Sequence, residues 1–344
     1  MALKATSWSE RTLTDNGVRL NGNGSNPNQY MDTAPHMRSA VSIHDILAPA
    51  KAELSLVEAK MKTVDGSLFR PLANAFVDLI GSGGKRLRPA VALMTSRLAR
   101  SSNGAAMPDE RVISLAASVE MLHTSTLVHD DVIDGALLRR GAPTLNAQWT
   151  RGATVLAGDF MFARAAYFAA ETENPRVIKI FSDTLEVIVN GELRQLWSRR
   201  RFNQDLDEYY RRIEAKTASL FQAAAESAGV LAGMAEPDVQ RVRSYGNNLV
   251  IAFQIVDDIL DFTSDEGSLG KPAGSDLLQG TLTLPFFHYV QSLPQPELLL
   301  ESLENAYAVA DDNPDAWHAL AAQVAADVKR SPAIDAARDD AIVY

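Results

Sequence analysis

The chain has 344 residues, 46% of them apolar, and a formal net charge of −10. The apolar content is ample for a large core, the acidic balance without a basic stripe argues against a nucleic-acid partner, and the lack of cysteine excludes disulfides and thiol chemistry. No apolar run approaches the roughly 18 residues of a membrane-spanning helix, so we expect a protein of the cytoplasm.

Residues 1–39 are polar and rich in Asn, Gly, Ser and Thr, which predicts a disordered tail. Over residues 40–344 apolar residues recur at helical spacing and alternating β-branched runs are hard to find, so we expect an all-α fold. Asp45 follows Ser42 at the third position, a signature of a helix N-terminus. Helices are expected over residues 42–64, 68–80, 110–134, 152–171, 175–198, 204–228, 237–262 and within 296–344, and one more ends near residue 100.

A glycine-rich basic segment, GSGGKRLRP, follows the second of these helices. Its glycines stop the helix and let the backbone approach a ligand closely, and Pro89 suits the first turn of the next helix. Lys85, Arg86 and Arg88 form a compact cationic cluster at that helix start, where an anion would bind well. Solvated clusters of Lys and Arg are common, so this loop alone indicates little.

Two segments far apart in the chain, LVHDDVIDG and QIVDDILDF, repeat the pattern DDxxD. Acidic pairs on helices are usually solvated surface, but the apolar residues around both clusters predict largely buried helices, where carboxylates are usually ligands or catalysts. Aspartates one and four apart share a helix face and repel one another, and a hard divalent cation such as Mg²⁺ would relieve that repulsion. Two facing clusters would hold a polyphosphate through bridging metals. The six aspartates are Asp130, Asp131, Asp134, Asp257, Asp258 and Asp261.

Several residues near the first cluster are ambiguous by themselves. Arg139 and Arg140 are either salt-bridge partners of the cluster or phosphate clamps, and a bound metal favours the second interpretation. His123 lies two helical turns before Asp130 on much the same face, where a histidine is more often a core residue than a ligand. His129 could suggest a His-Asp metal hydrolase, but the other histidines assemble no second imidazole signature.

The chain resembles the trans-polyprenyl diphosphate synthase family in five motifs, which occur in the order GGKRLRP, LVHDDVIDGALLRRG, KTASL, FQIVDDILDF and GKPAGSDLLQGTLTLP. The resemblance covers the chain from about residue 42 to its C-terminus. It implies one catalytic domain over residues 40–344, an isoprenoid-synthase-type helical bundle around a deep central cavity, Mg²⁺ between the two acidic helices, and a homodimer. The implied substrates are isopentenyl diphosphate and an allylic diphosphate, with weak membrane association for release of the product.

By motif position the resemblance also implies roles for single residues. The six aspartates match metal ligands that grip the allylic diphosphate. Contacts to that diphosphate or to the reacting centre are implied for Arg139, Lys216, Thr217, Gln254 and Lys271. The pocket for isopentenyl diphosphate is implied at Lys85, Arg88, His123 and Arg140, and a polar position lining the cavity at Gln195.

The implied reaction is an ionisation, a condensation and an elimination. Mg²⁺, Arg139 and Lys216 stabilise charge on the departing diphosphate, which leaves an allylic cation. The double bond of isopentenyl diphosphate attacks this cation, and a proton is then lost to the released diphosphate. Water has to be excluded because it would quench the cation.

The length of the product is expected to depend on the helix face before Asp130. Short-chain members of the family place an aromatic residue four or five positions before the first aspartate, whereas Thr126 and Ser125 are small. Each turn opened is roughly 5.4 Å, about one isoprene unit, and Met121 and Leu122 are the next candidates for a floor. We therefore expect a medium or long all-trans chain of the kind used for quinone side chains, with a geranylgeranyl or farnesyl diphosphate synthase as the alternative.

Two features depart from the family pattern. Thr281 stands where many members carry a lysine, so one phosphate contact is expected to be missing or replaced. The C-terminus falls one or two helices earlier than the resemblance suggests. Two rival interpretations are a class I terpene cyclase, which usually replaces the second DDxxD with an Asn/Asp-Ser/Thr-Glu triad, and a non-catalytic partner subunit, which tends to lose one acidic cluster.

Overall fold

The computed structural model describes residues 42–63, 69–81, 84–100, 109–139, 141–198, 201–264, 273–310 and 312–344. The tail expected over residues 1–39 lies outside these ranges, as do Arg140 and Lys271. Contacts between Cα atoms divide the chain into Met1–Ile46 and a compact unit, Leu47–Tyr344. A single catalytic domain over residues 40–344 stays a prediction.

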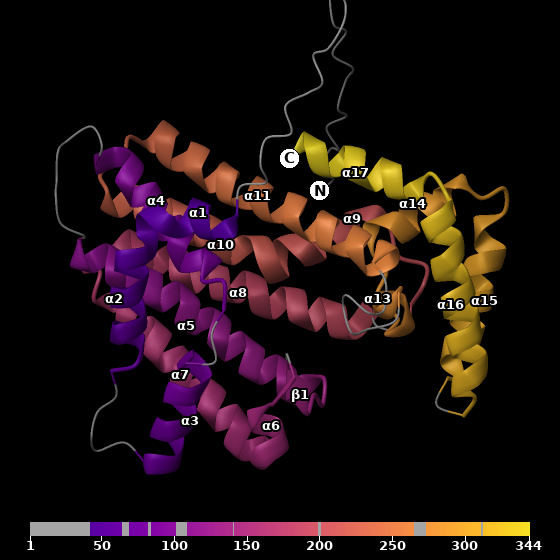
Figure 1. The fold of residues 1–344 in the computed structure, drawn as a ribbon, viewed down its shortest axis with the longest axis horizontal. Helices are drawn as coiled ribbons and strands as arrows, with labels where there is room; N and C mark the ends of the chain where they lie inside the picture. The colour runs from indigo at the N-terminus through magenta and orange to yellow at the C-terminus, as the bar shows by residue number, and fades with distance from the viewer. Residues whose placement is uncertain are drawn as a thin grey trace, which may run out of the picture. The chain divides into compact units, whose positions relative to one another are not determined.

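The described part of the chain is almost entirely helical, which confirms the expected all-α fold (Figure 1). Two short strands, β1 (Leu138–Arg139) and β2 (Ala142–Pro143), form an antiparallel hairpin that the sequence did not predict. The helices are α1 (Ile43–Leu47), the 3₁₀ turn η1 (Ala48–Ala50), α2 (Lys51–Met61), α3 (Arg70–Gly81), α4 (Leu87–Arg100), α5 (Glu110–Ile133), α6 (Leu145–Gln148), α7 (Arg151–Ala170), α8 (Pro175–Ser198), α9 (Leu206–Ile213), the π-helical turn η2 (Glu214–Ala218), α10 (Ser219–Leu231), α11 (Glu236–Thr263), α13 (Ser275–Leu278), α14 (Leu284–Ser292), α15 (Pro296–Ala308), α16 (Pro314–Arg330) and α17 (Ala333–Val343).

The helix predicted over residues 42–64 is present but interrupted. Its N-terminal signature is confirmed, because Ser42 Oγ accepts a hydrogen bond from the Asp45 N–H at 3.2 Å and Asp45 Oδ2 accepts from the Ser42 N–H at 3.2 Å. The turn η1 that contains Pro49 then separates α1 from α2. Proline has no N–H for the helical ladder, which explains the break.

Helix α5 runs through the core and carries the first acidic cluster at its C-terminal end. It packs against α2, α4, α7 and α10, and most of its residues from Val112 to Ser125 are buried. Ser118 and Ser125 donate hydrogen bonds to carbonyl oxygens of α7, at 2.8 and 2.9 Å. A Cβ at Gly158 of α7 would collide with the His129 ring, so a larger residue there would have to displace that ring. The position of the cluster is therefore fixed by tight packing of α5 on α7.

The helix predicted over residues 204–228 is divided by the π-helical turn η2, which lies between α9 and α10. Helix α8 packs closely against this turn, since a Cβ at Gly191 would lie 2.5 Å from the Ala215 Cβ. A π turn adds one residue to a helical turn and is frequent at functional sites. Here it carries Lys216 and Thr217, which face a cavity described below.

An aromatic cluster fixes the loop between α13 and α14. The ring centroids of Tyr307 and Trp317 lie 4.7 Å apart, and the Trp317 indole N–H donates to the Leu278 carbonyl at 3.0 Å. Gly280 has a φ of +76°, and a Cβ there would lie 2.9 Å from the Tyr307 ring. The loop therefore passes directly beneath Tyr307, and its residues become one wall of the cavity.

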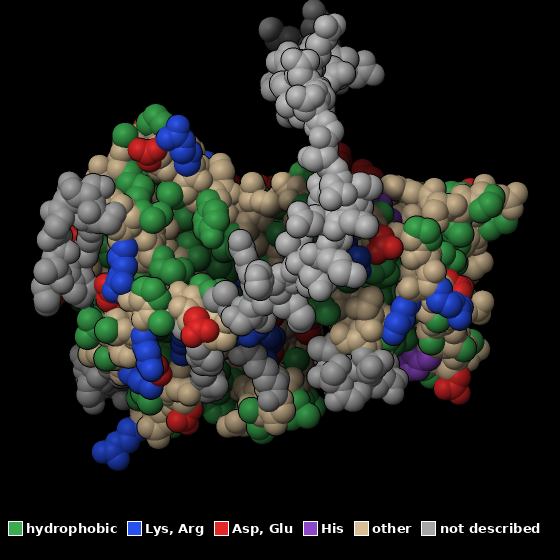
Figure 2. All heavy atoms as spheres, turned by 45° about the horizontal axis from the view of Figure 1, so that its top comes forward, with side chains coloured by type: hydrophobic (Ala, Val, Ile, Leu, Met, Phe, Trp, Pro, Cys, Tyr) green, Lys and Arg blue, Asp and Glu red, His purple; other side chains and the backbone are tan. Residues whose placement is uncertain are grey.

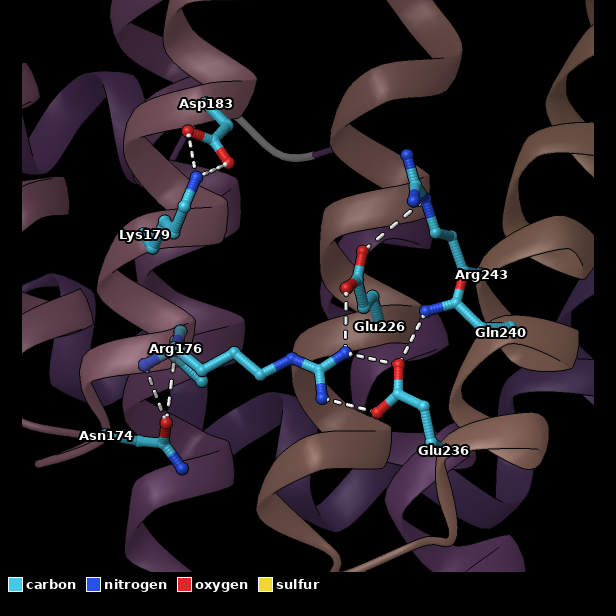
Figure 3. A network of polar contacts seen from close by, with 9 residues as sticks. Asn174, Arg176, Lys179, Asp183, Glu226, Glu236, Gln240 and Arg243 are labelled. Carbon is cyan, nitrogen blue, oxygen red and sulfur yellow. Dashed lines mark hydrogen bonds and ion pairs between the residues drawn. The ribbon is translucent and has the colours of Figure 1, made fainter.

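One arginine joins the starts of α8 and α11 to α10 at the surface (Figure 3). The Arg176 guanidinium donates to Glu236 at 2.6 and 2.9 Å and to Glu226 at 3.3 Å. Hydrogen bonds from Arg176 and then Gln240 lower the pKa of Glu236 to about 2. This network includes no residue of either acidic cluster.

The surface combines charged and apolar side chains. On the face drawn in Figure 2, the Lys and Arg side chains of the described residues are scattered among Asp and Glu and form no continuous basic stripe. Apolar side chains also reach this face in several patches. Of the helices described, none is both long enough and apolar enough to cross a lipid bilayer.

Candidate active site

A cavity of about 860 Å³ brings together elements from distant parts of the chain. Its wall is built by the end of α5, the loop before β1, α8, α9 with η2, α11, the loop after α13, and Tyr307 of α15. The expected cavity is thus present, and it contains several of the side chains singled out from the sequence. The predicted site residues in its wall are Asp134, Gln195, Lys216, Thr217, Gln254 and Asp258.

Asp131 is the most buried aspartate of the first cluster, with 5% of its surface exposed. Arg139 of β1 donates to Asp131 Oδ1 through Nε at 3.0 Å and through Nη2 at 2.9 Å. Asp134 ends α5 as its C-cap and is exposed. Of the two interpretations of Arg139 from the sequence, the structure contains the salt bridge, which places a guanidinium beside the cluster.

Lys216 links the first cluster to α8. Its Nζ lies 2.8 Å from Glu192 Oε1 and 3.7 Å from Asp130 Oδ2. Burial raises the pKa of Asp130 to about 6, helped by the nearby charges of Glu192 and Asp134, whereas Lys216 and Arg139 oppose the rise. The carboxylate is therefore poorly solvated and only partly neutralised, which favours binding of a further cation.

The second cluster is held by neutral groups. Asp258 of α11 is 2% exposed and accepts hydrogen bonds from the Tyr209 hydroxyl at 2.7 Å and from Gln254 Nε2 at 2.9 Å. Burial raises its pKa to about 6, and these two hydrogen bonds only partly oppose the rise. The pKa of Tyr209 is raised well above its usual value by burial and by Asp258.

The other two aspartates of this cluster differ from Asp258. Asp257 is exposed. Asp261 accepts a hydrogen bond from Ser275 Oγ at 2.7 Å and from the Asp276 N–H at 3.2 Å, so its carboxylate holds the start of α13. The three residues predicted as equivalent ligands therefore have three different environments.

Tyr209 was missed by sequence reasoning. It lies seven residues before Lys216, which is two helical turns, and this spacing could have placed both on one face. Tyrosines are frequent on apolar helix faces, however, so the spacing alone does not indicate a contact with Asp258. Its role became visible only when α9 and α11 were seen side by side at the cavity.

The donor set fits Mg²⁺ without forming a finished metal site. Among the described residues no three His, Asp or Glu side chains gather closely enough to hold an ion by themselves. Asp130 and Asp258 are buried oxygen donors with raised pKa values, and Asp134 and Asp258 lie in the wall of one cavity. Mg²⁺ typically takes one or two carboxylates and completes its shell with water and substrate phosphate. The spread arrangement suits an ion that arrives with a phosphate.

The basic segment before α4 is only partly available to a ligand. Arg86 is committed to the fold, since it forms an ion pair with Glu120 at 2.7 Å and donates to the Ile80 carbonyl. Arg88 Nε is buried and has no hydrogen-bond partner among the described residues, and burial lowers the pKa of Arg88 to about 10. Lys85 is exposed and His123 is half-buried.

These last three residues do not line the 860 Å³ cavity in the described structure. They were predicted to form one pocket, and Glu120 of α5 connects them only in part. It pairs with Arg86, acts electrostatically on Arg88 and lies three residues before His123. Arg140 and Lys271 lie outside the described residues.

An apolar groove of about 440 Å³ extends from the first cluster between α5, α7 and α8. Asp130 lies in its wall, and Thr126, Ser125 and Leu122 follow toward the N-terminus of α5. The small residues expected to open this face therefore do line the groove. Leu122 also lines a narrow pocket of about 10 Å³ beyond it. Of the two candidates for a floor Leu122 lines the groove, whereas Met121 is fully buried elsewhere in the core.

The chain is similar to known proteins in both sequence and structure. The model of the protein family described as "Polyprenyl synthetase" matches residues 70–320. The chain is 38% identical to component 2 of heptaprenyl diphosphate synthase from Geobacillus stearothermophilus, over 82% of this chain and 83% of that protein. It is similar in structure to heptaprenyl diphosphate synthase from Staphylococcus aureus, with a TM-score of 0.76 and 31% identity over 86% and 88% of the two chains. A polyprenyl synthase from Caulobacter crescentus CB15, complexed with calcium and isoprenyl diphosphate, gives a TM-score of 0.74 and 34% identity over 89% and 90%.

Proposed function

The chain belongs to the polyprenyl synthetase family, and from this premise we propose which of its residues bind the diphosphates, hold the metal and limit the product. Family membership makes the chain a transferase of prenyl groups, of the type that makes medium- to long-chain polyprenyl diphosphates. The observation that carries the residue assignment is the meeting of α5, η2 and α11 around one cavity, with carboxylates and a lysine in its wall.

Lys216 and Arg139 bind the diphosphate of the allylic substrate and stabilise the charge that develops as it departs. Both cations already lie beside the first cluster, within hydrogen-bonding or ion-pair distance of Glu192 and Asp131. A diphosphate would compete for these cations without any large movement. Thr217 and Gln254, in the same wall, orient the diphosphate or the reacting carbon.

Mg²⁺ would be held by the oxygen atoms of the two clusters, and when bound it supplies Lewis-acid stabilisation of the diphosphate charge. Tyr209 and Gln254 orient the Asp258 carboxylate for this purpose through their two hydrogen bonds. Asp261 accepts hydrogen bonds from Ser275 and from the Asp276 N–H and would bind the metal through its remaining lone pairs. The Caulobacter relative complexed with calcium and isoprenyl diphosphate supports a divalent cation at such a site. The expected ligands are Asp130, Asp131, Asp134, Asp257, Asp258 and Asp261.

The second substrate, isopentenyl diphosphate, binds at the basic segment. Arg88 offers a buried N–H without a partner among the described residues, which a phosphate oxygen would satisfy. Lys85 and His123 add a flexible cation and an imidazole, and Arg140 completes the set by motif position. Lys271 belongs by motif position with the residues that contact the allylic diphosphate or the reacting centre. Gln195 gives the wall of the central cavity a polar position.

The growing prenyl chain occupies the apolar groove. The groove excludes water from the allylic cation and offers no bulk at Thr126 or Ser125. Leu122 lies eight residues before Asp130, which corresponds to roughly 12 Å along the helix. A longer product therefore has to displace Leu122 and enter the narrow pocket beyond it, and we propose this side chain as the main limit on length.

A homodimer accounts for the apolar side chains that α7 and α8 leave exposed. Leu156 is 68% exposed and Trp197 75%, values that a monomer rarely leaves on neighbouring helices. A second copy is the expected cover, and light scattering on the purified protein tests it. The cytoplasmic location and weak membrane association for product release stay predictions.

Incubation of the purified chain with Mg²⁺, labelled isopentenyl diphosphate and single primers tests the proposed function. The primers are dimethylallyl, geranyl, farnesyl and geranylgeranyl diphosphates, and products are measured by mass spectrometry. A ladder ending in one dominant medium or long product is expected. A cyclic hydrocarbon formed from a primer alone would favour a terpene cyclase, and no consumption of isopentenyl diphosphate would point to a subunit that needs a partner.

A further inference from the structure

Arg212 lies in the cavity wall without having been predicted from the sequence. It belongs to the last turn of α9, four residues before Lys216, and both side chains line the cavity. Its Nη2 donates to the Leu282 carbonyl, and its guanidinium lies 5.6 Å from the centre of the Tyr209 ring. These two contacts hold the half-buried side chain between the Tyr209 ring of its own helix and the loop before α14.

The charge of Arg212 is not neutralised by a direct ion pair within the described residues. Asp258 and Asp276 act on it electrostatically, and the Asp258 oxygens accept their hydrogen bonds from Tyr209 and Gln254. A guanidinium has five N–H donors, and the bond to Leu282 uses one of them. Arg212 therefore retains donors for a ligand in the cavity.

Thr283 supplies a second, independent observation in the same wall. It is 3% exposed, and its Oγ1 has no hydrogen-bond partner among the described residues. It occupies the N-cap position of α14 with extended backbone, yet its side chain caps no N–H of that helix. A buried hydroxyl without a partner is destabilising, and the N-terminus of a helix favours an anion.

We propose that Arg212 and the Thr283 hydroxyl, at the N-terminus of α14, form a phosphate cradle that binds one phosphate group of the allylic diphosphate. The guanidinium offers a planar pair of donors, a geometry that matches phosphate oxygens, and the hydroxyl donates to a third oxygen. Thr281 in the same wall is uncharged, so α9 provides the cation that this loop lacks. The identity of the ligand rests on the proposed function, whereas the site itself rests on the geometry.

Binding of inorganic pyrophosphate to the full-length protein in the presence of Mg²⁺, measured by isothermal titration calorimetry, tests the cradle. Arg212→Gln should weaken binding about tenfold to a hundredfold, and Thr283→Val about threefold to tenfold, because a charged and a neutral hydrogen bond are lost. The matched control is Arg211→Gln. Arg211 is exposed and pairs with Glu208 and Asp207, and its replacement should change binding less than twofold.

Thermal unfolding separates a binding role from a structural one. Thr283→Val removes a buried hydroxyl that has no partner among the described residues, so its melting temperature should be equal to or above that of the wild type while pyrophosphate binds more weakly. Thr281→Lys placed in the Arg212→Gln background should restore binding, since it returns a cation to the same wall. If Arg212→Gln and Thr283→Val both bind pyrophosphate as tightly as Arg211→Gln, the cradle does not exist.

Steady-state kinetics separate failure of the cradle from failure of the proposed function. In Arg212→Gln the KM for the allylic diphosphate should rise while the KM for isopentenyl diphosphate stays unchanged. If the wild type elongates no primer but its pyrophosphate affinity depends on Arg212 and Thr283, the cradle is supported and the proposed function is wrong. If the wild type elongates normally but neither the affinity nor the KM changes in the variants, the proposed function is supported and the cradle is wrong.

Discussion

The first acidic cluster, at the end of α5, has two cations beside it. Lys216 Nζ lies 3.7 Å from Asp130, and Arg139 donates a hydrogen bond to Asp131. On α11, by contrast, Asp258 accepts its two hydrogen bonds from neutral groups, Tyr209 and Gln254. Burial raises the pKa of both Asp130 and Asp258 to about 6.

The two clusters share one sequence pattern but have different partners, which indicates different roles in binding. The first cluster already has cations beside it. An arriving diphosphate would therefore replace the carboxylates as the partner of Lys216 and Arg139. The second cluster has a carboxylate, Asp258, that neutral groups orient and that forms no ion pair with the described residues, so its first direct counter-ion would be the metal.

The largest effect is expected from removing one carboxylate charge in either cluster. Asp130→Asn and Asp258→Asn should each lower kcat by about 10² to 10⁴, because several kcal/mol of charge stabilisation in the transition state depends on the metal. Asp258→Asn should need the larger increase in Mg²⁺ for half-maximal rate, since no cation pairs directly with that site. The circular dichroism spectrum of both variants should remain that of a helical protein. Near-normal turnover in either variant would show that the replaced residue is not a metal ligand.

A smaller effect is expected from loosening one carboxylate while keeping its charge. Tyr209→Phe removes the hydroxyl that donates to Asp258 Oδ2 at 2.7 Å, and metal-supporting hydrogen bonds of this kind are worth about 10- to 100-fold in activity. The rate at saturating substrate is compared with that of Tyr210→Phe, a matched control in which the contact with Asp258 is intact. Equal rates in the two variants would contradict a positioning role for Tyr209.

The third prediction concerns the product rather than the rate. Thr126→Phe fills the groove one turn before Asp130, so the dominant product should become shorter, as measured by mass spectrometry. Thr126 is a better site than Ser125, which is 2% exposed and bonded to α7, where a large residue would overpack the core. Thr126→Val keeps the size and should keep the product. An unchanged product in Thr126→Phe would mean that the chain grows elsewhere.

The smallest effect on activity is expected from the surface network around Arg176 in Figure 3, which includes no residue of either cluster. Arg176→Ala should leave turnover unchanged and lower stability slightly, as is usual for surface ion pairs. The pKa of Glu236 is depressed from 4.5 to about 2, so the stabilisation is complete above pH 4.5 and is lost as the pH falls toward 2. The difference in free energy of unfolding between the wild type and Arg176→Ala, measured by urea unfolding at a series of pH values, should therefore shrink at acid pH. A difference that grows at acid pH would show that Glu236 is not stabilised by Arg176.

Much of the helical framework could be predicted from the sequence because apolar spacing reports burial directly. The helix over residues 175–198 has its predicted bounds, and α5 ends at Ile133, one residue from its expected end. The π turn at Lys216 could not be predicted, since residues 214–218 continue the apolar helical spacing of their neighbours and nothing local marks a change of winding. Motif order likewise located the aspartates, but not the neutral partners of Asp258 or the bond from Ser275 to Asp261.

Side chains that act through contacts between helices gave little sequence signal. Arg212 and Thr283 are ordinary residues in their local segments, and only the approach of α9 to the loop before α14 gives them a shared environment. The basic segment illustrates the opposite error. Lys85, Arg86 and Arg88 looked equivalent as a cluster in the sequence. In the structure, however, Arg86 forms an ion pair with Glu120 and a hydrogen bond to the Ile80 carbonyl.

The π turn sets the rotation of α9 about its axis relative to α10. A π-helical turn holds about one residue more than an α-helical turn, so the same residues wound as a continuous α-helix would rotate α9 by about 100°. Tyr209 and Arg212 would then turn away from the cavity although neither had been replaced. The winding of η2 therefore determines which residues α9 presents to the cavity, independently of what those residues are.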